Sequence, residues 1–281
     1  MWSRSISAGR SSAAALLAAA AALAVAAPAA SQDLGEPGDT LRYPFVAALS
    51  RGDPDGRVYF CAGALIAPDW VLTAAHCFYN PRGGRIAEAD LWVEVGGRRL
   101  ADVPEAGQVR VARIVAHPDY DPASQANDIA LIRLERIAGP LIAETEARGA
   151  AAPPRGTVLG FGSFYEGRLA ANALLSSGAP AAQVSDRLRQ AAVQTIGAET
   201  CAARLGDDAP PLAASQLCAA AGADETCVGD SGAPLVVEQG GADRVAGIVS
   251  LGSGCGTDRP VTVYTRVAPY ADWIAATLAG R

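Results

Sequence analysis

The sequence predicts an all-β protein, built either as barrels or as a sandwich of antiparallel sheets. Many short apolar runs of strand length are bounded by Gly, Pro or Asp, and no long helical patterns alternate with them. The 30 glycines and 18 prolines are spread along the chain, as expected for many tight turns. Half of the 281 residues are apolar, so the chain can bury a substantial core.

The predicted strands form two groups on either side of an Ala- and Pro-rich stretch at residues 138–155, which we interpret as the crossing between two halves. Only residues 270–278 show apolar side chains at helical spacing, so one C-terminal helix is expected. The expected strands are 45–49, 58–66, 70–74, 91–95, 109–115, 129–134, 157–161, 190–196, 235–238, 244–251 and 261–267.

The N-terminal region resembles a secretory signal peptide. Residues 13–27 contain no charge and follow Arg4 and Arg10, and this apolar stretch of about 15 residues is shorter than a spanning helix requires. Small residues precede an expected cleavage after Ala29, so residues 1–29 would be removed and residues 30–281 exported as one domain. An uncleaved membrane anchor is the alternative. No later segment is apolar enough to span, so no membrane association is expected after removal.

Charge and cysteine content narrow the classes of function. All 23 basic residues are arginine, and against 29 acids they leave a formal charge of −6, which argues against nucleic acid as a partner. Six cysteines, an even number in an exported chain, predict three disulfide bonds. The cysteines lack the close pairing of metal sites and the chain has only two histidines, so no metal site is expected.

The first chemical signal is a serine between glycines, in the run Gly-Asp-Ser-Gly at residues 229–232. A serine hydroxyl is a poor nucleophile alone. Flanking glycines let the backbone turn sharply and bring N–H groups close to a reacting carbonyl. Ser231 is therefore a candidate nucleophile, although an ordinary tight turn uses the same residue types.

The second signal is a histidine at the end of an expected strand, in Thr-Ala-Ala-His-Cys at residues 73–77. His76 is thereby a candidate base on a fixed element. A disulfide between Cys61 and Cys77 would hold its backbone and contribute about 3 kcal/mol in the chain-entropy model. A structural histidine in the core is the alternative interpretation.

The third signal is an acid at the mouth of an apolar strand, in Asn-Asp-Ile-Ala-Leu at residues 127–131. An ionised carboxylate at Asp128 must be paired or solvated. A histidine N–H is a suitable partner, because the acid fixes the tautomer and stabilises the imidazolium. A surface acid that caps the strand is the alternative.

Together the three blocks resemble those of the trypsin-like, chymotrypsin-fold family of secreted serine endopeptidases, whose residues follow the order His76, Asp128, Ser231. The resemblance runs from about Tyr43 to the C-terminus. It implies two packed antiparallel β-barrels with a C-terminal α-helix, and a triad between the barrels. Ser231 would be the nucleophile, His76 the general base and then acid, and Asp128 the orienting carboxylate. The amides of Gly229 and Ser231 would form the oxyanion hole.

The resemblance also implies substrate-binding roles. Ser250 would bond near Asp128, and Gly252 would leave the pocket wall open. Glu225 would floor the specificity pocket, where an acid favours Arg or Lys before the cut by direct ion pairing. Thr262 stands where glycine usually lines this pocket. A solvated acid in a loop is the alternative interpretation of Glu225.

Further expectations follow from the family. Polypeptides would be the substrates of a monomeric enzyme without a cofactor, and a protein inhibitor is a further expected partner. A catalytically silent binding protein on the same fold is the alternative, whereas an esterase would need a Gly-x-Ser-x-Gly elbow that the chain lacks. The implied disulfide pairs are Cys61 with Cys77, Cys201 with Cys218, and Cys227 with Cys255.

One part of the family pattern is missing. Family zymogens are cut ahead of an Ile-Val-Gly-Gly-like start, whose new amine pairs with the aspartate before the nucleophile, here Asp230. Residues 32–35, at the corresponding place, have no such motif. A buried unpaired carboxylate is costly, so Asp230 needs a cation. The candidates are an amine released near residues 32–35 and the side chain of Arg42.

Overall fold

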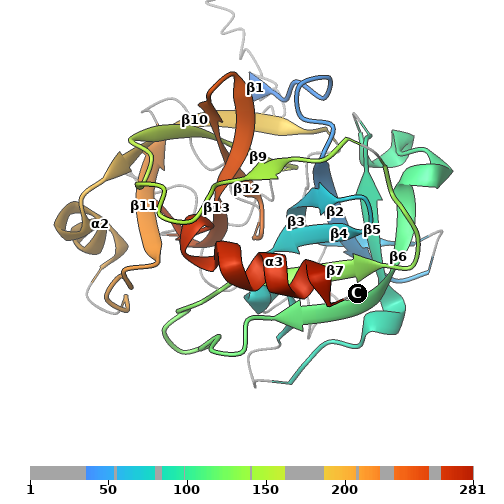
Figure 1. Cartoon of the computed structure of the whole chain (residues 1–281), viewed down its shortest axis with the longest axis horizontal. Helices are drawn as coiled ribbons and strands as arrows, with labels where there is room; N and C mark the ends of the chain where they lie inside the picture. The colour runs from blue at the N-terminus through green and yellow to red at the C-terminus, as the bar shows by residue number, and fades with distance from the viewer. Residues whose placement is uncertain are drawn as a thin grey trace, which may run out of the picture. The chain divides into compact units, whose positions relative to one another are not determined.

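The structure, a computed structural model, describes residues 36–53, 56–79, 84–97, 99–139, 141–161, 187–206, 209–221, 231–252 and 261–280. This part of the chain consists mainly of antiparallel strands that close into two barrels, with short helices at their edges (Figure 1). The two-barrel, all-β class expected from the sequence is confirmed.

The first barrel closes through strand pairs in the order β2-β3-β4-β7-β6-β5. Its interior is filled by branched side chains such as Leu49, Leu65, Val71 and Ile132, each at most 1 % exposed. Closure of the barrel buries the inward apolar side chains of these strands and leaves no strand edge unpaired. The strands are β2 (Val46–Arg51), β3 (Val58–Ala67), β4 (Trp70–Thr73), β5 (Leu91–Val95), β6 (Gln108–Ala116) and β7 (Ala130–Leu134).

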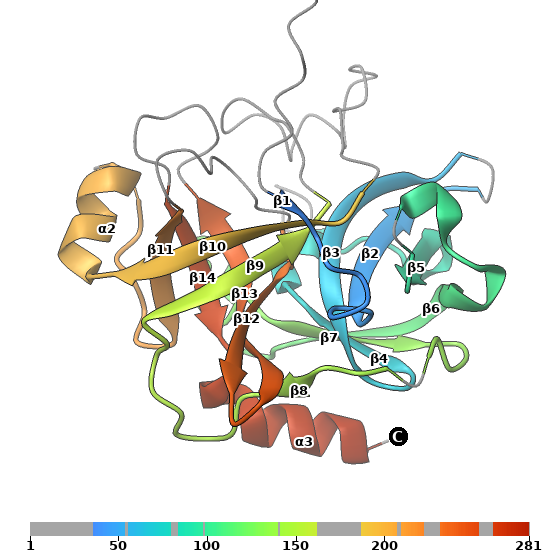
Figure 2. The ribbon, with the colours of Figure 1, turned by 90° about the horizontal axis from the view of Figure 1, so that it is seen from above.

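The second barrel runs β10-β11-β14-β13-β12-β9 and closes where β9 pairs with β10. Two short strands are added outside it: β1 (Glu36–Pro37) pairs with β10, and β8 (Glu144–Thr145) lies parallel to β13. Figure 2 shows the two barrels side by side. The six barrel strands are β9 (Arg155–Gly160), β10 (Arg189–Ile196), β11 (Gln216–Ala221), β12 (Pro234–Gln239), β13 (Ala242–Gly252) and β14 (Thr262–Arg266).

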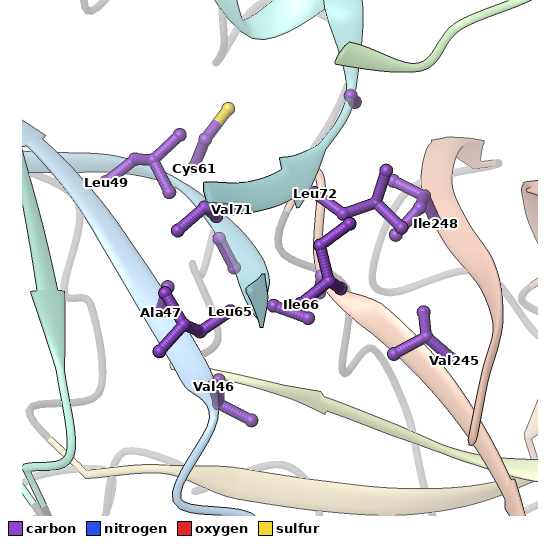
Figure 3. Packing of buried hydrophobic residues seen from close by; sticks show 14 of the residues in the cluster. Val46, Ala47, Leu49, Cys61, Leu65, Ile66, Val71, Leu72, Val245 and Ile248 are labelled. Carbon is purple, nitrogen blue, oxygen red and sulfur yellow. The ribbon is translucent and has the colours of Figure 1, made fainter. Parts of the chain in front are cut away.

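The two barrels share one hydrophobic core. In Figure 3, Ile66 and Leu72 of the first barrel lie toward Val245 and Ile248 of β13. All four side chains are buried, with Leu72, Val245 and Ile248 at 0 % exposure. Burying such side chains is worth about 1.5 to 3 kcal/mol each, so this packing fixes the barrels against each other.

Two α-helices are described. The expected C-terminal helix is confirmed as α3 (Ala271–Ala279), and a 3-10 turn, η5 (Ala268–Tyr270), precedes it. Ile274 is buried on its inner face. In the described ranges, no helix has the length and apolarity to cross a membrane. The other short 3-10 helices are η1 (Ala75–Phe78), η2 (Glu88–Asp90), η3 (Leu100–Asp102) and η4 (Glu105–Gly107).

Two elements of the second barrel were not expected from the sequence. β11 is rich in alanine and has no alternating pattern, but it pairs with β10 on one side and β14 on the other. Helix α2 (Ala198–Leu205) is only eight residues long and buries Cys201 alone. A disulfide joins Cys201 to Cys218 of β11, so tertiary attachment accounts for a helix too short to persist by itself.

Candidate active site

The antiparallel pairing of β4 and β7 brings the candidate base and acid together. Thr73, the last residue of β4, lies opposite Ala130, the first of β7. His76 follows β4 in η1, and Asp128 precedes β7 by two residues. Both side chains therefore lie at the same end of this strand pair, although 52 positions separate them in the chain.

Asp128 is completely buried and holds His76 through two hydrogen bonds. The backbone N–H of His76 donates to Oδ1 at 2.8 Å, and the ring atom Nδ1 lies 2.7 Å from Oδ2. Because an ionised carboxylate only accepts, Nδ1 carries the proton and Nε2 is left free to accept one.

Ser250 provides a third donor to Asp128. Its hydroxyl donates to Oδ2 at 2.5 Å, from a point in β13 where the register with β14 shifts between Val249 and Leu251. Such an irregularity re-aims a side chain out of the regular alternation. The position of Ser250 near Asp128 is thus a product of both the second barrel and this bulge.

The electrostatics of the pair favour its charged form. Burial opposes ionisation of Asp128, but the charge and hydrogen bonds of His76 and the bond from Ser250 hold the pKa of the acid below its ordinary value. Burial would also lower the pKa of His76, but attraction to the Asp128 carboxylate outweighs it and raises the pKa. His76 keeps 20 % of its side chain exposed, whereas Asp128 has none.

A disulfide supports the backbone of η1. Cys61 of β3 is bonded to Cys77, the neighbour of His76. The two sulfurs and a ring nitrogen of His76 lie within 4.8 Å of one another. Three such atoms could suit a metal ion, but sulfurs joined in a disulfide supply no thiolate ligand. The disulfide therefore holds the backbone beside His76, the candidate base, and its sulfurs do not provide a metal centre.

Ser231 and the glycine after it are placed by contacts to both barrels. Its carbonyl accepts the N–H of Ala62 at 2.8 Å, and the N–H of Gly232 donates to Val249 at 2.9 Å. Gly232 has φ +81°, and a Cβ there would overlap Thr73 Oγ1 and the Ala62 carbonyl. The chain after Ser231 thus fits directly against the end of β4, just before η1.

The importance of Thr73 was not expected from the sequence. Its hydroxyl donates to the Ala62 carbonyl at 2.6 Å and forms part of the surface that receives Gly232. Thr73 is completely buried. The sequence signal for this role was a threonine at the end of an apolar strand, because a hydroxyl buried there needs a hydrogen-bond partner.

Of the expected substrate-binding residues, Gly252 and Thr262 lie opposite each other in the β13–β14 register. A Cβ on Gly252 would lie 3.7 Å from Thr262 Oγ1, so the threonine hydroxyl faces the backbone of the glycine. Ser250 is two residues earlier on the same strand.

Several expected site residues lie outside the described residues. They include the pocket-floor candidate, an oxyanion donor, the aspartate before the nucleophile and the third disulfide pair. These positions are Glu225, Gly229, Asp230, Cys227 and Cys255.

Arg42, a candidate partner for Asp230, binds two other acids in the part of the chain that the structure describes. Its guanidinium binds Asp243 through Nε and Nη2, both at 2.8 Å, and Glu238 at 3.1 Å. These acids hold the pKa of Arg42 above its ordinary value. Arg42 therefore ties the N-terminal segment to the β12–β13 hairpin, where a two-pronged donor meets a carboxylate.

Comparison with known proteins identifies relatives over most of the chain. The family model described as Trypsin matches residues 34–274. Serine protease 56 of Mus musculus is 35% identical over 78% of this chain, and coagulation factor XII of Cavia porcellus is 36% identical over 83%. The chain spans only 34% and 38% of the length of these two relatives. A trypsin of Saccharopolyspora erythraea is 32% identical over 85% of this chain and 94% of its own length.

We predict that Gly232→Ala destabilises the protein more than Gly241→Ala. Both glycines have φ near +80°, where alanine costs about 1 to 2 kcal/mol, but nothing lies within 4 Å of a Cβ at Gly241. At Gly232 the overlap with Thr73 and Ala62 should add about 1 to 3 kcal/mol. Urea unfolding measures both, and equal losses would show that the close fit around Gly232 is not tight.

Proposed function

The chain belongs to the trypsin family of serine proteases, and on this premise we propose that it is an exported endopeptidase that uses His76, Asp128 and Ser231. The observation that carries the proposal is the 2.7 Å contact between Nδ1 of His76 and a completely buried Asp128. Burial of an ionised carboxylate is costly unless the carboxylate is paired with a cation. His76 becomes that cation when it acts as a general base and accepts a proton.

The proposed reaction is acyl transfer in two steps. Ser231 attacks the carbonyl carbon of a peptide bond, and Nε2 of His76 takes the proton of the hydroxyl. Asp128 stabilises the imidazolium. The same proton then passes to the leaving amine, the peptide bond breaks, and an acyl-enzyme remains on Ser231. Water, activated by His76, hydrolyses the ester. The amides of Gly229 and Ser231 are the proposed donors to the oxyanion.

The expected pH dependence follows from the pKa of His76. The base must be neutral to accept the proton of Ser231, and Asp128 raises the pKa of the ring. Hydrolysis should therefore increase as the pH rises through a value above about 6.5, the ordinary pKa of histidine.

We propose polypeptides as substrates, with Arg or Lys before the cut and Glu225 as the acid that pairs with it. Export after removal of residues 1–29, a monomeric state and control by a protein inhibitor complete the proposal. A catalytically silent binding protein on the same fold is the second candidate, favoured by the missing Ile-Val-Gly-Gly-like start.

We predict that Ser231→Ala and His76→Ala each remove nearly all peptide hydrolysis while the fold persists, because the three residues act as a unit. Hydrolysis of a peptide library measures the loss, and circular dichroism tests the fold. A serine-directed phosphonate should label Ser231 in the unmodified protein and be detected by mass spectrometry. Absence of both label and hydrolysis in correctly processed protein would leave the binding protein as the better proposal.

A second prediction concerns specificity. Peptide-library profiling should show cleavage after Arg or Lys, and Glu225→Gln should weaken that preference because the ion pair is lost. Glu199→Gln, which changes an exposed acid on α2, is the matched control and should leave the profile unaltered. An apolar or small-residue preference that Glu225→Gln does not change would contradict the proposed role.

A third prediction concerns activation. With Arg42 bound to the hairpin, an amine released near residues 32–35 is the remaining proposed partner of Asp230. No basic residue lies between Ala30 and Leu41, so we favour signal-peptidase or internal processing over a trypsin-like cut. N-terminal sequencing of active enzyme from the native host, beside an assay of protein starting at Ala30, measures this. An inert Ala30 form that gains activity only after a new internal cut would overturn our preference.

A further inference from the structure

We propose that Tyr270 and Asn127 form a positioning link that sets the orientation of Asp128, so that the acid is held by the segment leading into the C-terminal helix. This inference rests on the proposed function, because it concerns the acid that pairs with His76. Neither residue contacts the reacting atoms in that scheme. Their action would pass through the backbone of Asp128.

The backbone before Asp128 has an unusual conformation. Asn127 has φ +56°, a left-handed value that few side chains adopt and that asparagine tolerates better than most. Its carbonyl accepts the N–H of Ile129 at 2.8 Å, which closes a tight turn around Asp128. The direction of the Asp128 side chain therefore depends on the conformation of Asn127.

The side chain of Asn127 is bound at both ends. Nδ2 donates to the carbonyl of Asp119 at 2.8 Å, and Oδ1 accepts the hydroxyl of Tyr270 at 2.8 Å. A backbone carbonyl can only accept, so these partners define which end of the amide faces each one. Tyr270 is buried, at 5 % exposure. Removing its hydroxyl would leave Oδ1 without this donor.

The phenol of Tyr270 is itself held in place. Its ring packs edge-to-face on His117 with centroids 5.1 Å apart, and Trp273 of α3 contacts the same histidine at 5.1 Å. His117 accepts the N–H of Asp119 on Nδ1 at 3.2 Å and donates its own backbone N–H to Ile129 at 3.0 Å. The corner between η5 and α3 thus packs on both ends of the loop that carries Asp128.

A second contact from the other barrel holds the same loop. Gln125, which also has φ +56°, accepts the side-chain N–H of Gln216 on its carbonyl at 3.1 Å. Gln216 begins β11. Gln125 is therefore bonded to β11 of the second barrel and Asn127 to the turn before α3. Together these bonds over-determine a loop conformation that would otherwise relax.

The titratable groups around Asp128 are compatible with this role. His76 faces the carboxylate from η1, and the phenols of Tyr120 and Tyr270 feel its charge. Burial and the Asp128 charge raise the pKa of both phenols, so Tyr270 keeps its proton for donation. Ser215 partly offsets this rise in the pKa of Tyr270, but burial outweighs its effect.

The test is Tyr270→Phe, which removes one hydroxyl and keeps the ring on His117. The chain has only two histidines, so NMR follows the His76 ring directly through a pH titration, and His117→Gln assigns the signals. We expect the pKa of His76 to fall towards its ordinary value of about 6.5, because a misdirected Asp128 stabilises the imidazolium less. With a substrate, kcat should fall about threefold to tenfold while KM stays within about twofold.

Two further variants make the test specific. Tyr43→Phe removes the hydroxyl of another buried tyrosine, which lies outside the loop that carries Asp128, and should leave the pKa of His76 and kcat unchanged. Asn127→Gly accepts φ +56° but lacks the bound amide, and it should reproduce the effect of Tyr270→Phe. This variant separates side-chain anchoring from the backbone angle.

The outcomes are distinct. An unchanged His76 pKa in both Tyr270→Phe and Asn127→Gly overturns the proposal, as does an equal fall in Tyr43→Phe, which would indicate general loosening. If the pKa of His76 falls as expected but the unmodified protein neither hydrolyses peptides nor takes the phosphonate on Ser231, the proposed function fails and the positioning link stands.

Discussion

The arrangement of the candidate site depends on the burial of one carboxylate. Asp128 has no exposed surface, and an ionised acid in that position is stable only when donors replace the water that it loses. The donors come from both barrels, because His76 follows a strand of the first and Ser250 lies on a strand of the second. Neither barrel alone provides the full set of donors. Asp128 can therefore be stably ionised only when the two barrels are docked.

Apolar packing performs the positioning that this polar site requires. Leu72 and Ile248 meet in a shared core, and the same approach brings the carbonyl of Ser231 to the N–H of Ala62. This close approach requires a glycine at position 232, because a Cβ there would overlap Thr73 and Ala62 of the first barrel. The candidate nucleophile and the candidate acid are thus located by non-directional burial and then aimed by a few hydrogen bonds.

The sequence predicted most of the strands because burial leaves a local pattern. The run at 91–95 corresponds to β5 residue for residue, whereas alanine-rich β11 has no such pattern and is defined by its two neighbours. His76 and Asp128 could be paired by motif, but the contact of Tyr270 with Asn127 joins positions 143 residues apart and leaves no local signal. The contacts of Arg42 with Asp243 and Glu238 could not be predicted for the same reason, since sequence does not indicate which carboxylate a guanidinium will meet.

The attachment of the N-terminal segment has a consequence for the order of folding. Asp39 bonds to Gln190 and Arg42 to Asp243, 151 and 201 positions later, whereas the first barrel closes from the contiguous stretch 46–134. During synthesis, the bond of Asp39 requires β10 and the bonds of Arg42 require the β12–β13 hairpin. The fully docked N-terminal segment therefore forms only after Asp243 has left the ribosome, and any maturation step that recognises the docked form must follow the synthesis of this hairpin.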